Sequence, residues 1–419
     1  MTYQKPKGTR DISGRELRRI ETVCREARVF FGRHGYQEIR TPTFESADLF
    51  ARSIGPGTDI VEKEMYSFVH DDKTFVLRPE GTASVLRAVI ENQLPLPGRY
   101  LYIANMFRKE KPQKGRYREF LQIGVELLGE AKPYYDAELI LQARDFLSLI
   151  GAGDITIEIN SIGCPRCRTA YRDLLTKALT GSFEQLCADC RRRFDKNFLR
   201  IFDCKVEACR AIYRTLPAIT DHLCVECAEH YQRVKFYLDA LSVPYRENKG
   251  LVRGLDYYVR TVFEFKSAGL GAQDTILAGG RYDRLMQELG GGEAPSIGWA
   301  MGVERMLIAM PEDRPKIEEP KVFMVAAMGV PALSKAITLD RMIRDLGCVC
   351  YVGNPDDSLK QQLKKADRLA VDHAIILGEE ELKEGYLTVR DMKQSEQKKI
   401  TEAEFEKFLN EIQTDRSDR

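Results

Sequence analysis

Long apolar runs and an excess of charge are both missing from this sequence. No stretch of 18 apolar residues occurs, and the opening Met1-Thr2-Tyr3-Gln4-Lys5-Pro6 contains no apolar segment, which excludes a membrane-spanning helix and argues against a secretory signal. The 64 Lys and Arg residues nearly balance the 63 Asp and Glu residues, leaving a formal charge of +1. Without a global positive field, any contact with nucleic acid must use local basic patches. We therefore expect a cytoplasmic protein with no membrane partner.

The cysteines exclude a further class, the secreted proteins held together by disulfides. Their number, eleven, is odd, and eight of them lie between Cys164 and Cys227, which fits reduced thiols or metal ligands better. Cys-x-x-Cys pairs can bind Zn²⁺, but free cysteine also packs as a small apolar residue. Both interpretations stay open, as does the question of which cysteines would share a metal. The candidates are the pairs Cys164/Cys167, Cys187/Cys190 and Cys224/Cys227, with Cys204, Cys209 and, as further ligands, His222 and His230.

The first part of the chain has the pattern of an antiparallel sheet with helices packed on one face. With 419 residues, 43% of them apolar, two or three domains are expected. Residues 14–34 predict a helix with one buried stripe. Apolar runs at 74–77 and 100–103 predict strands, and 259–265 with 276–278 predicts a hairpin. The stripe of the helix consists of Leu17, Ile20, Val23, Ala27 and Phe30.

The residue composition and the predicted pattern of elements change twice further along the chain. Residues 160–245 carry the clustered cysteines and short helical patterns, and we interpret them as an inserted helical domain. A charged linker punctuated by proline lies at 314–320, and beyond it strands and helices alternate, which predicts a parallel-rich α/β domain. The expected elements are strands at 322–327, 348–352 and 374–377, helices at 334–346 and 358–370, and a terminal helix that begins with a capping box of Thr401 and Glu404.

Three separate segments each carry an arginine in a setting that suits anion recognition. Arg253 lies in the segment 251–258, which also contains an acid and two adjacent tyrosines. Arg108 begins a basic segment, and Arg305 follows a glycine-rich stretch just before an apolar helix. Arginines from three segments can surround a polyphosphate from different sides.

These segments, in their order along the chain, resemble the motifs of class II aminoacyl-tRNA synthetases. The first motif corresponds to 35–42, the second to 107–122 and the third to 296–305. The segments 253–258 and 278–283 resemble those of the histidyl-tRNA synthetase family. The similarity extends from Lys5 to the last helix.

The resemblance implies an α+β protein built from three parts. A catalytic domain of the class II type, with an antiparallel sheet, would comprise residues 1–159 and 246–312. A helical, cysteine-rich insertion would occupy 160–245. An α/β anticodon-binding domain would occupy 321–413. The first motif, centred on Pro42, resembles the class II dimer interface, so a homodimer is expected.

The activity that the resemblance implies is ATP-dependent ligation of L-histidine to tRNA(His) through a histidyl-adenylate, with Mg²⁺ sharing the neutralisation of the phosphates. Arg108 would hold the α-phosphate, and Arg253 would neutralise the carboxylate and α-phosphate as the transition state forms. Both are therefore expected to be catalytic. The alternative for Arg253 is a structural ion pair with Asp256. The resemblance assigns ATP binding to Arg108, Glu110, Arg116 and Arg305, with Glu110 on the adenine side and Arg305 at the γ-phosphate.

Specificity for histidine requires hydrogen bonds to both imidazole nitrogens, because a site that pairs polar edges rejects analogues lacking them by about 10⁴. Glu126 is expected to accept from one ring N–H and Tyr258 to serve the other nitrogen. Glu80 is expected near the α-amino group, although a glutamate there is otherwise commonly a solvated strand-end residue. Carried over by position, the histidine site comprises Glu80, Gly81, Thr82, Arg108, Gln122, Glu126, Arg253, Tyr257, Tyr258 and Tyr282.

RNA contacts are expected at two places. Gln113, at the tip of the basic loop in the second motif, could read a base edge of the tRNA acceptor end. Lys360, Lys364 and Lys365 give one helix of the C-terminal domain a basic face. A solvated helix surface is the alternative interpretation of these lysines.

Two rival functions share the same scaffold. A regulatory paralogue of a histidine-biosynthesis enzyme would usually lack the anticodon domain and would have lost characteristic residues of the second and third motifs. A tRNA-binding sensor without enzymatic activity would be expected to lose the arginines that contact ATP. The presence of Arg108, Arg253 and Arg305 argues against both.

Overall fold

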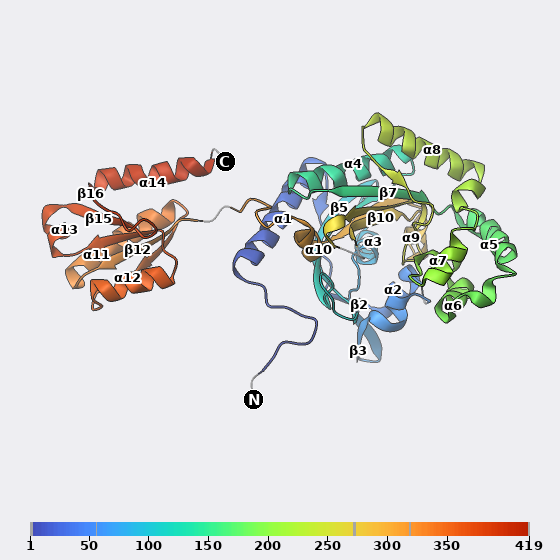
Figure 1. The fold of residues 1–419 in the computed structure, drawn as a ribbon, viewed down its shortest axis with the longest axis horizontal. Helices are drawn as coiled ribbons and strands as arrows, with labels where there is room; N and C mark the ends of the chain where they lie inside the picture. The colour runs from blue at the N-terminus through green and yellow to red at the C-terminus, as the bar shows by residue number, and fades with distance from the viewer. Residues whose placement is uncertain (1–2, 56, 271–273, 318–319, 418–419) are drawn as a thin grey trace. The chain divides into compact units, whose positions relative to one another are not determined.

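The structure, a computed structural model, describes residues 3–55, 57–270, 274–317 and 320–417. It divides into two compact units, Met1–Lys316 and Ile317–Arg419, and the second unit has the orange-to-red end of the colour scale in Figure 1. The boundary falls inside the expected linker at 314–320, of which residues 318–319 lie outside the described part. Within the described ranges, no helix is both long and apolar enough to cross a membrane.

An eight-stranded sheet forms the centre of the first unit. Its six middle strands are antiparallel, whereas each edge strand runs parallel to its neighbour. The expected hairpin is confirmed, with Phe265 paired to Leu277. The strand order is β1 (Gln37–Glu38), β5 (Gly98–Phe107), β6 (Glu119–Leu128), β11 (Ser296–Gly302), β10 (Thr275–Arg281), β9 (Val259–Ser267), β7 (Ile155–Ser161) and β8 (Arg246–Glu247).

One face of this sheet packs against four helices and forms the larger core. Phe263, Phe265 and Trp299 from the strands contribute to this core, and Figure 1 shows α4 and α8 running along the sheet. The predicted stripe on the first helix is confirmed except at Leu17, which is 41% exposed. Leu17 lies near the start of the helix, beyond the edge of the core. The helices are α1 (Gly14–Arg33), α4 (Pro133–Leu149), α8 (Val225–Ala240) and α10 (Val303–Ala309).

The opposite face of the sheet also carries helices, so the expectation of helices on one face only was wrong. Helices α3 (Thr82–Glu91) and α9 (Leu285–Glu288) pack there against Tyr100, Tyr102 and Leu128. A small three-stranded sheet lies beside them, with α2 (Ala47–Ile54) and the short π-helix η1 (Ile60–Glu64). Its strands are β2 (Phe44–Ser46), β4 (Lys73–Leu77) and β3 (Tyr66–His70).

The cysteine-rich segment is helical, as its sequence predicts. Its buried residues join the core on the face that carries α3, whereas α8, at its end, packs on α4 in the larger core. Its helices are α5 (Pro165–Leu179), η2 (Phe183–Gln185), α6 (Ala188–Lys196), η3 (Phe198–Asp203), α7 (Glu207–Tyr213) and η4 (Ile219–His222).

The second unit is a five-stranded sheet with helices. Its first three strands are parallel as expected, and the last two are antiparallel. The helix expected from 334 begins at Val330, since Pro331 suits the first turn of a helix. The expected capping box is confirmed: the amide of Thr401 donates to Glu404 at 2.7 Å. Its strands, in sheet order, are β13 (Val349–Val352), β12 (Val322–Ala327), β14 (His373–Leu377), β15 (Tyr386–Asp391) and β16 (Gln397–Thr401).

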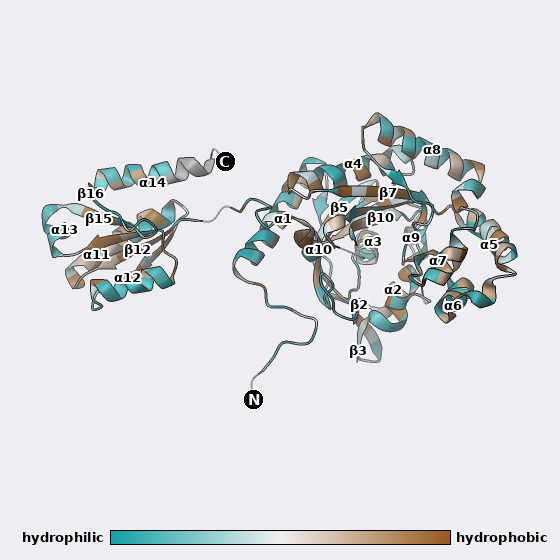
Figure 2. Cartoon of the chain, in the orientation of Figure 1, coloured by the Kyte–Doolittle hydropathy of each residue, from teal (hydrophilic) through white to brown (hydrophobic). Residues whose placement is uncertain are grey.

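Helix α12 (Leu359–Arg368) presents the basic face that its sequence predicts. Lys360, Lys364 and Lys365 are all exposed, and Figure 2 shows this helix as mainly hydrophilic. The other helices of the unit are α11 (Val330–Asp345), α13 (Glu379–Glu384) and α14 (Glu402–Ser417).

Candidate functional site

A cavity of about 660 Å³ opens in the first unit, between the sheet, the loop after β5 and part of the cysteine-rich segment. Most of the residues expected from the sequence meet here, although they come from segments as far apart in the sequence as Glu80 and Arg305. Those that line the cavity are Glu80, Thr82, Arg108, Glu110, Arg116, Gln122, Arg253, Tyr257, Tyr258 and Arg305. Those that lie outside its lining are Gly81, Gln113, Glu126 and Tyr282.

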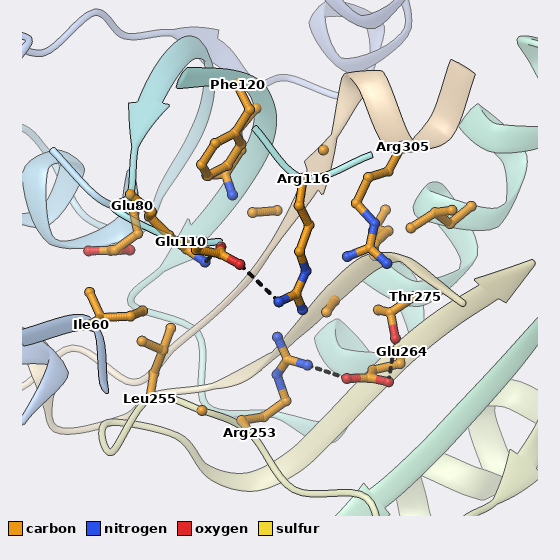
Figure 3. Close-up of a pocket in the computed structure, with 18 of the residues that line it drawn as sticks. Ile60, Glu80, Glu110, Arg116, Phe120, Arg253, Leu255, Glu264, Thr275 and Arg305 are labelled. Atoms are coloured by element: carbon orange, nitrogen blue, oxygen red, sulfur yellow. Dashed lines mark hydrogen bonds and ion pairs between the residues drawn. The ribbon is translucent and has the colours of Figure 1, made fainter. Parts of the chain in front are cut away.

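Four arginines give one side of this cavity a concentrated positive charge. Figure 3 shows the guanidinium groups of Arg116, Arg253 and Arg305 pointing toward one another across the space. Burial and the nearby Arg116 together lower the pKa of Arg305. Arg108 donates from Nε to the carbonyl oxygen of Pro79 at 2.9 Å, which orients its side chain. Cations held this close to one another favour an anionic ligand such as a phosphate.

Carboxylates hold two of these arginines in place. Arg116 donates to Glu110 at 2.8 Å, and Arg253 forms a close ion pair with Glu264. Burial disfavours the charged form of Arg253, but Glu264 outweighs that effect and raises its pKa. The sequence alternative of a pair between Arg253 and Asp256 was therefore wrong. Asp256 instead accepts a hydrogen bond from Asn197.

Glu264 is a residue of the site that the sequence analysis missed. It lies on β9 between the buried Phe263 and Phe265, and side chains alternate between the two faces of a strand. Glu264 therefore faces the cavity, where Thr275 donates to it at 2.8 Å. A charged residue between two core phenylalanines was the signal that could have revealed it.

Glu80 is buried, so its alternative as a solvated residue was wrong. Only 4% of it is exposed, and its carboxylate accepts from the amides of Thr82 at 2.8 Å and Ala83 at 2.9 Å. These amides begin α3, where backbone N–H groups have no partner within the helix. Burial raises the pKa of Glu80, and the two amide hydrogen bonds oppose that rise.

Two polar atoms near Glu80 have no hydrogen-bond partner within the described part of the chain. They are Oε1 of Gln122 and the hydroxyl of Tyr102, both buried in residues that line the cavity. The ring of Tyr102 fits between Gly81 and Gly124, where a Cβ atom would lie 2.4 Å and 2.2 Å from its Cζ. Gly81 thus shapes the cavity without lining it. Unpaired buried polar atoms carry a free-energy cost that a polar ligand can remove.

Glu126 and Tyr282 lie together directly behind this polar wall. Glu126 is fully buried, accepts from the hydroxyl of Thr82 at 2.7 Å, and accepts from the hydroxyl of Tyr282. Burial raises the pKa of Glu126 to about 8, although both hydrogen bonds act in the opposite direction. The carboxyl group is therefore largely protonated at neutral pH.

Arg281, the neighbour of Tyr282, has a structural role. Its guanidinium is fully buried and pairs with Asp136 of α4, which also lies 3.2 Å from Nε2 of His230. Burial opposes the ionisation of Asp136, but Arg281 and His230 outweigh it and lower the pKa. His230 is thus committed to this network and is not a ligand in the cysteine clusters.

The clustered cysteines form two groups of four, which resolves the pairing that the sequence left open. In each group the sulfur atoms all lie within 4.8 Å of one another, and no histidine joins either group among the residues described. One group is Cys164, Cys167, Cys224 and Cys227, and the other is Cys187, Cys190, Cys204 and Cys209.

Comparisons with known proteins match both units. A family model of histidyl-tRNA synthetase matches residues 8–306, and one of the anticodon binding domain matches residues 322–412. The histidine–tRNA ligase of Desulfitobacterium hafniense is 44% identical over 415 residues, which are 98% of each chain. That of Aquifex aeolicus is 44% identical over 404 residues, 96% of this chain and 99% of the relative.

A solved structure agrees with these matches. The crystal structure of apo S. aureus histidyl-tRNA synthetase has a TM-score of 0.80 and 32% sequence identity, covering 97% of this chain and 100% of that one. The expected α+β class II fold with a C-terminal anticodon-binding domain is thereby confirmed. The chain belongs to the histidyl-tRNA synthetase family.

Proposed function

We propose that this enzyme uses ATP to join L-histidine to tRNA(His) through a histidyl-adenylate. The observation that carries the proposal is the division of the cavity, with arginines on one side and buried polar groups on the other. The first side suits the phosphates of ATP, and the second suits a small polar amino acid. The relatives described above bear the name histidine–tRNA ligase.

In the first step, a carboxylate oxygen of histidine attacks the α-phosphorus of ATP, and the bond to the bridging oxygen of pyrophosphate breaks. Both reactants are anions, so positioned cations must neutralise the charge that gathers at the α-phosphate. Arg108 and Arg253 are proposed to do this, with ATP entering as its magnesium complex. No protein base is needed, because the attacking carboxylate is already ionised.

The remaining cations are proposed to hold the rest of the nucleotide. Arg305 would bind the γ-phosphate. Glu110 would lie on the adenine side, and its 2.8 Å hydrogen bond from Arg116 keeps it oriented. Glu264 would limit the motion of Arg253, because an ion pair with a mostly buried carboxylate restricts a long side chain.

On the polar side, Glu80, Thr82 and Gln122 are proposed to bind the α-ammonium group of histidine. The unpaired Oε1 of Gln122 can accept one of its protons. Tyr257 would shape the pocket. Tyr258 and Glu126 would each form a hydrogen bond with one of the two imidazole nitrogens. Because Glu126 lies behind Thr82, we propose that histidine displaces the hydroxyl of Thr82 from that carboxylate.

In the second step, a terminal ribose hydroxyl of tRNA(His) attacks the carbonyl carbon of the adenylate, and AMP leaves. Gln113, in the turn where it pairs with Arg116, is proposed to contact the acceptor end. The lysine-rich face of α12 is proposed to contact the anticodon region through phosphates. Residues 160–245 are proposed as an insertion, and Pro42 as part of a homodimer interface.

Exchange between ATP and pyrophosphate, measured with each of the twenty amino acids, tests this proposal. We expect exchange with histidine alone, followed by charging of tRNA(His) when tRNA is added. Exchange with another amino acid would overturn the proposed substrate. No exchange at all from folded protein would favour the regulatory paralogue.

A further inference from the structure

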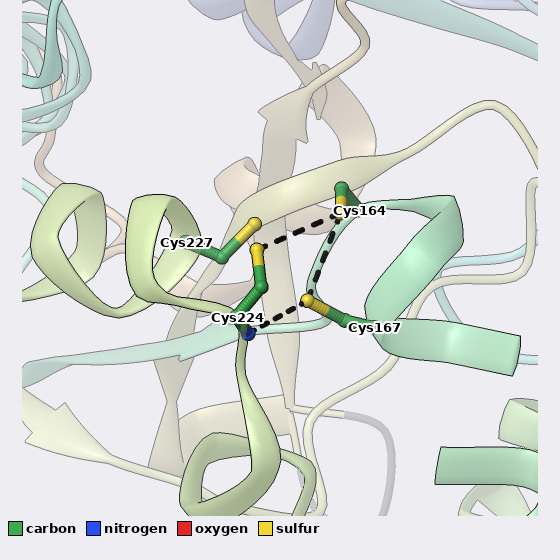
Figure 4. Close-up of side chains that lie close together, drawn as sticks. All are labelled: Cys164, Cys167, Cys224 and Cys227. Atoms are coloured by element: carbon green, nitrogen blue, oxygen red, sulfur yellow. Dashed lines mark hydrogen bonds between the residues drawn. The ribbon is translucent and has the colours of Figure 1, made fainter. Parts of the chain in front are cut away.

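Four cysteines lie together where the chain enters and leaves the cysteine-rich segment. Cys164 precedes α5 and Cys167 lies in its first turn, whereas Cys224 precedes α8 and Cys227 lies in its first turn. Figure 4 shows the two pairs facing each other across the gap between these helices. About sixty residues of sequence separate the pairs, so only the fold brings them together. We refer to these four cysteines as the entry cluster.

A second group of four cysteines, with one Cys-x-x-Cys pair instead of two, lies inside the segment. Cys187 precedes α6 and Cys190 lies in its first turn, and Cys209 lies in the first turn of α7. Cys204 completes the group from the turn that follows η3. We refer to these four as the inner cluster.

The sulfur–sulfur distances distinguish between a disulfide and a metal. Cys164 lies 3.7 Å from Cys167 and 4.0 Å from Cys224, and Cys187 lies 3.9 Å from Cys204. A disulfide requires about 2.05 Å. A tetrahedron with zinc–sulfur bonds of about 2.3 Å has edges of about 3.8 Å. These three edges therefore have the size expected of a tetrathiolate metal site, and all other edges are within 4.8 Å. We propose that the entry cluster and the inner cluster each bind one Zn²⁺.

Backbone groups already support the sulfur atoms in both clusters. The amide of Cys224 donates to Sγ of Cys167 at 3.1 Å, and the amide of Cys187 donates to Sγ of Cys209 at 3.3 Å. Such hydrogen bonds stabilise thiolates and orient metal ligands. Gly163 has φ +64°, and a Cβ there would lie 2.6 Å from Cβ of Cys167. The chain turns this tightly into the entry cluster only because that residue is glycine.

Tyr213 provides a second observation at the inner cluster. Its hydroxyl is buried without a hydrogen-bond partner in the described ranges, and the thiol of Cys190 lies near it. Metal binding would convert Cys190 to a thiolate, which is a stronger acceptor than a thiol. The unsatisfied hydroxyl would then have a partner.

Each site has a structural consequence. Zinc in the entry cluster would fasten the two ends of the segment to each other, independently of its interior. Zinc in the inner cluster would fix Cys204, whose neighbours Asp203 and Lys205 both line the cavity. Asp203 also lies near Arg253 in the lining of this cavity. The inner site would therefore hold one wall of the ATP side in place.

Metal analysis of the full chain, purified without chelator, tests the proposal directly. We expect about two equivalents of zinc per chain, and cobalt substitution should give the visible bands of tetrahedral thiolate coordination. A thiol-specific mercurial should release both zinc ions into a colorimetric indicator. Zinc near zero, or disulfides within the clusters of protein kept under reducing conditions, would overturn it.

Substitution of one buried ligand in each cluster assigns the two metals. Cys167→Ser and Cys190→Ser should each lower zinc to about one equivalent, whereas Cys24→Ser, which replaces a buried cysteine of α1 outside both clusters, should retain about two. If a variant fails to fold, the mercurial titration of the unaltered chain still decides the number of sites. Retention of both metals in Cys167→Ser or Cys190→Ser would overturn the assigned ligands.

Limited proteolysis separates the roles of the two sites. We expect Cys167→Ser to create new protease cleavage sites near both ends of residues 160–245. Cys190→Ser should create new cleavage sites between α6 and α7. Cys24→Ser should keep the cleavage pattern of the unaltered chain. Identical patterns in all four proteins would show that the metals do not hold the segment together. None of these measurements depends on aminoacylation, so they can fail while the proposed function stands.

Discussion

The two sides of the cavity hold their polar groups in different ways. On the side proposed to bind ATP (the ATP side), arginines project into the cavity and form ion pairs with carboxylates such as Glu110 and Glu264. On the side proposed to bind histidine (the histidine side), Glu126 and Tyr282 are buried and hydrogen-bonded to each other behind the cavity wall. The first arrangement suits the stabilisation of charge that develops on a phosphate. The second suits discrimination between ligands, because buried polar groups penalise any ligand that leaves them unpaired.

The largest effect is expected beneath the histidine side, in the buried pair of Asp136 and Arg281. Asp136→Asn leaves the buried guanidinium without its counter-charge, which should lower the free energy of unfolding by about 3–5 kcal/mol. Denaturant unfolding of the full chain measures the loss. Asp145→Asn, which removes the exposed partner of Arg144, is the control and should change little. A loss below about 1 kcal/mol at Asp136 would show that this buried pair contributes little to the stability of the fold.

The next effect is kinetic and belongs to the ATP side. Arg253→Ala should slow adenylate formation by about 10² or more, roughly 3 kcal/mol of transition-state stabilisation, and should change the affinity for histidine less. Single-turnover adenylation and histidine-dependent exchange measure the two quantities. Arg284→Ala, which removes an exposed arginine near the site, provides the comparison. Near-normal exchange by the Arg253 variant would remove this residue from the mechanism.

A smaller effect is expected on the histidine side when one hydroxyl is removed. Tyr282→Phe takes a hydrogen bond from the buried carboxyl group of Glu126, a loss of about 1–3 kcal/mol. The KM for histidine should rise about tenfold while the KM for ATP stays near normal. Tyr36→Phe removes another buried hydroxyl, which donates to Gln142 at 3.0 Å and does not line the cavity, and should alter neither. Equal changes in both KM values for Tyr282→Phe would contradict the assignment of histidine and ATP to different sides of the cavity.

The smallest effect is a dependence on pH. The raised pKa of Glu126, about 8, keeps its carboxyl group protonated below that pH, and ionisation as the pH rises makes it a better acceptor for an imidazole N–H. Histidine affinity should therefore increase about fivefold between pH 7 and pH 8. Titration calorimetry at both values measures this change, with Glu126→Gln as the variant that cannot ionise. The same increase in that variant would assign the dependence to another group.

The two sides also differ in how far the sequence predicted them. Arg108, Arg116, Arg253 and Arg305 could be placed at the cavity because the segments that carry them resemble motifs of the family. The depth of Glu126 could not, because it depends on the packing of β6 against β11 and α3, which are distant in sequence. The partner of Arg253 was assigned wrongly for a similar reason. Glu264 comes from the strand that follows, whereas Asp256 was merely nearby in the chain.

The fold was predicted where patterns are local. The strands, the hairpin and the capping box of the last helix were correct because their determinants lie within a few residues. The helices on the second face of the sheet were missed, since α3 and α9 are short and their burial depends on tertiary contacts. The division of eight cysteines into two groups also required the fold, because Cys164 and Cys224 approach only in three dimensions.

The glycines around Tyr102 set a limit on how this pocket can evolve. Gly81 and Gly124 flank the phenol ring so closely that a methyl group at either position would occupy space already taken by the ring. Any side chain at either position therefore requires Tyr102 to leave its present place in the lining of the cavity. A change of amino-acid preference would have to begin at Tyr102 itself, because a smaller side chain there would enlarge the pocket. Gly81 and Gly124 on either side of the ring have no side chain that could be shortened.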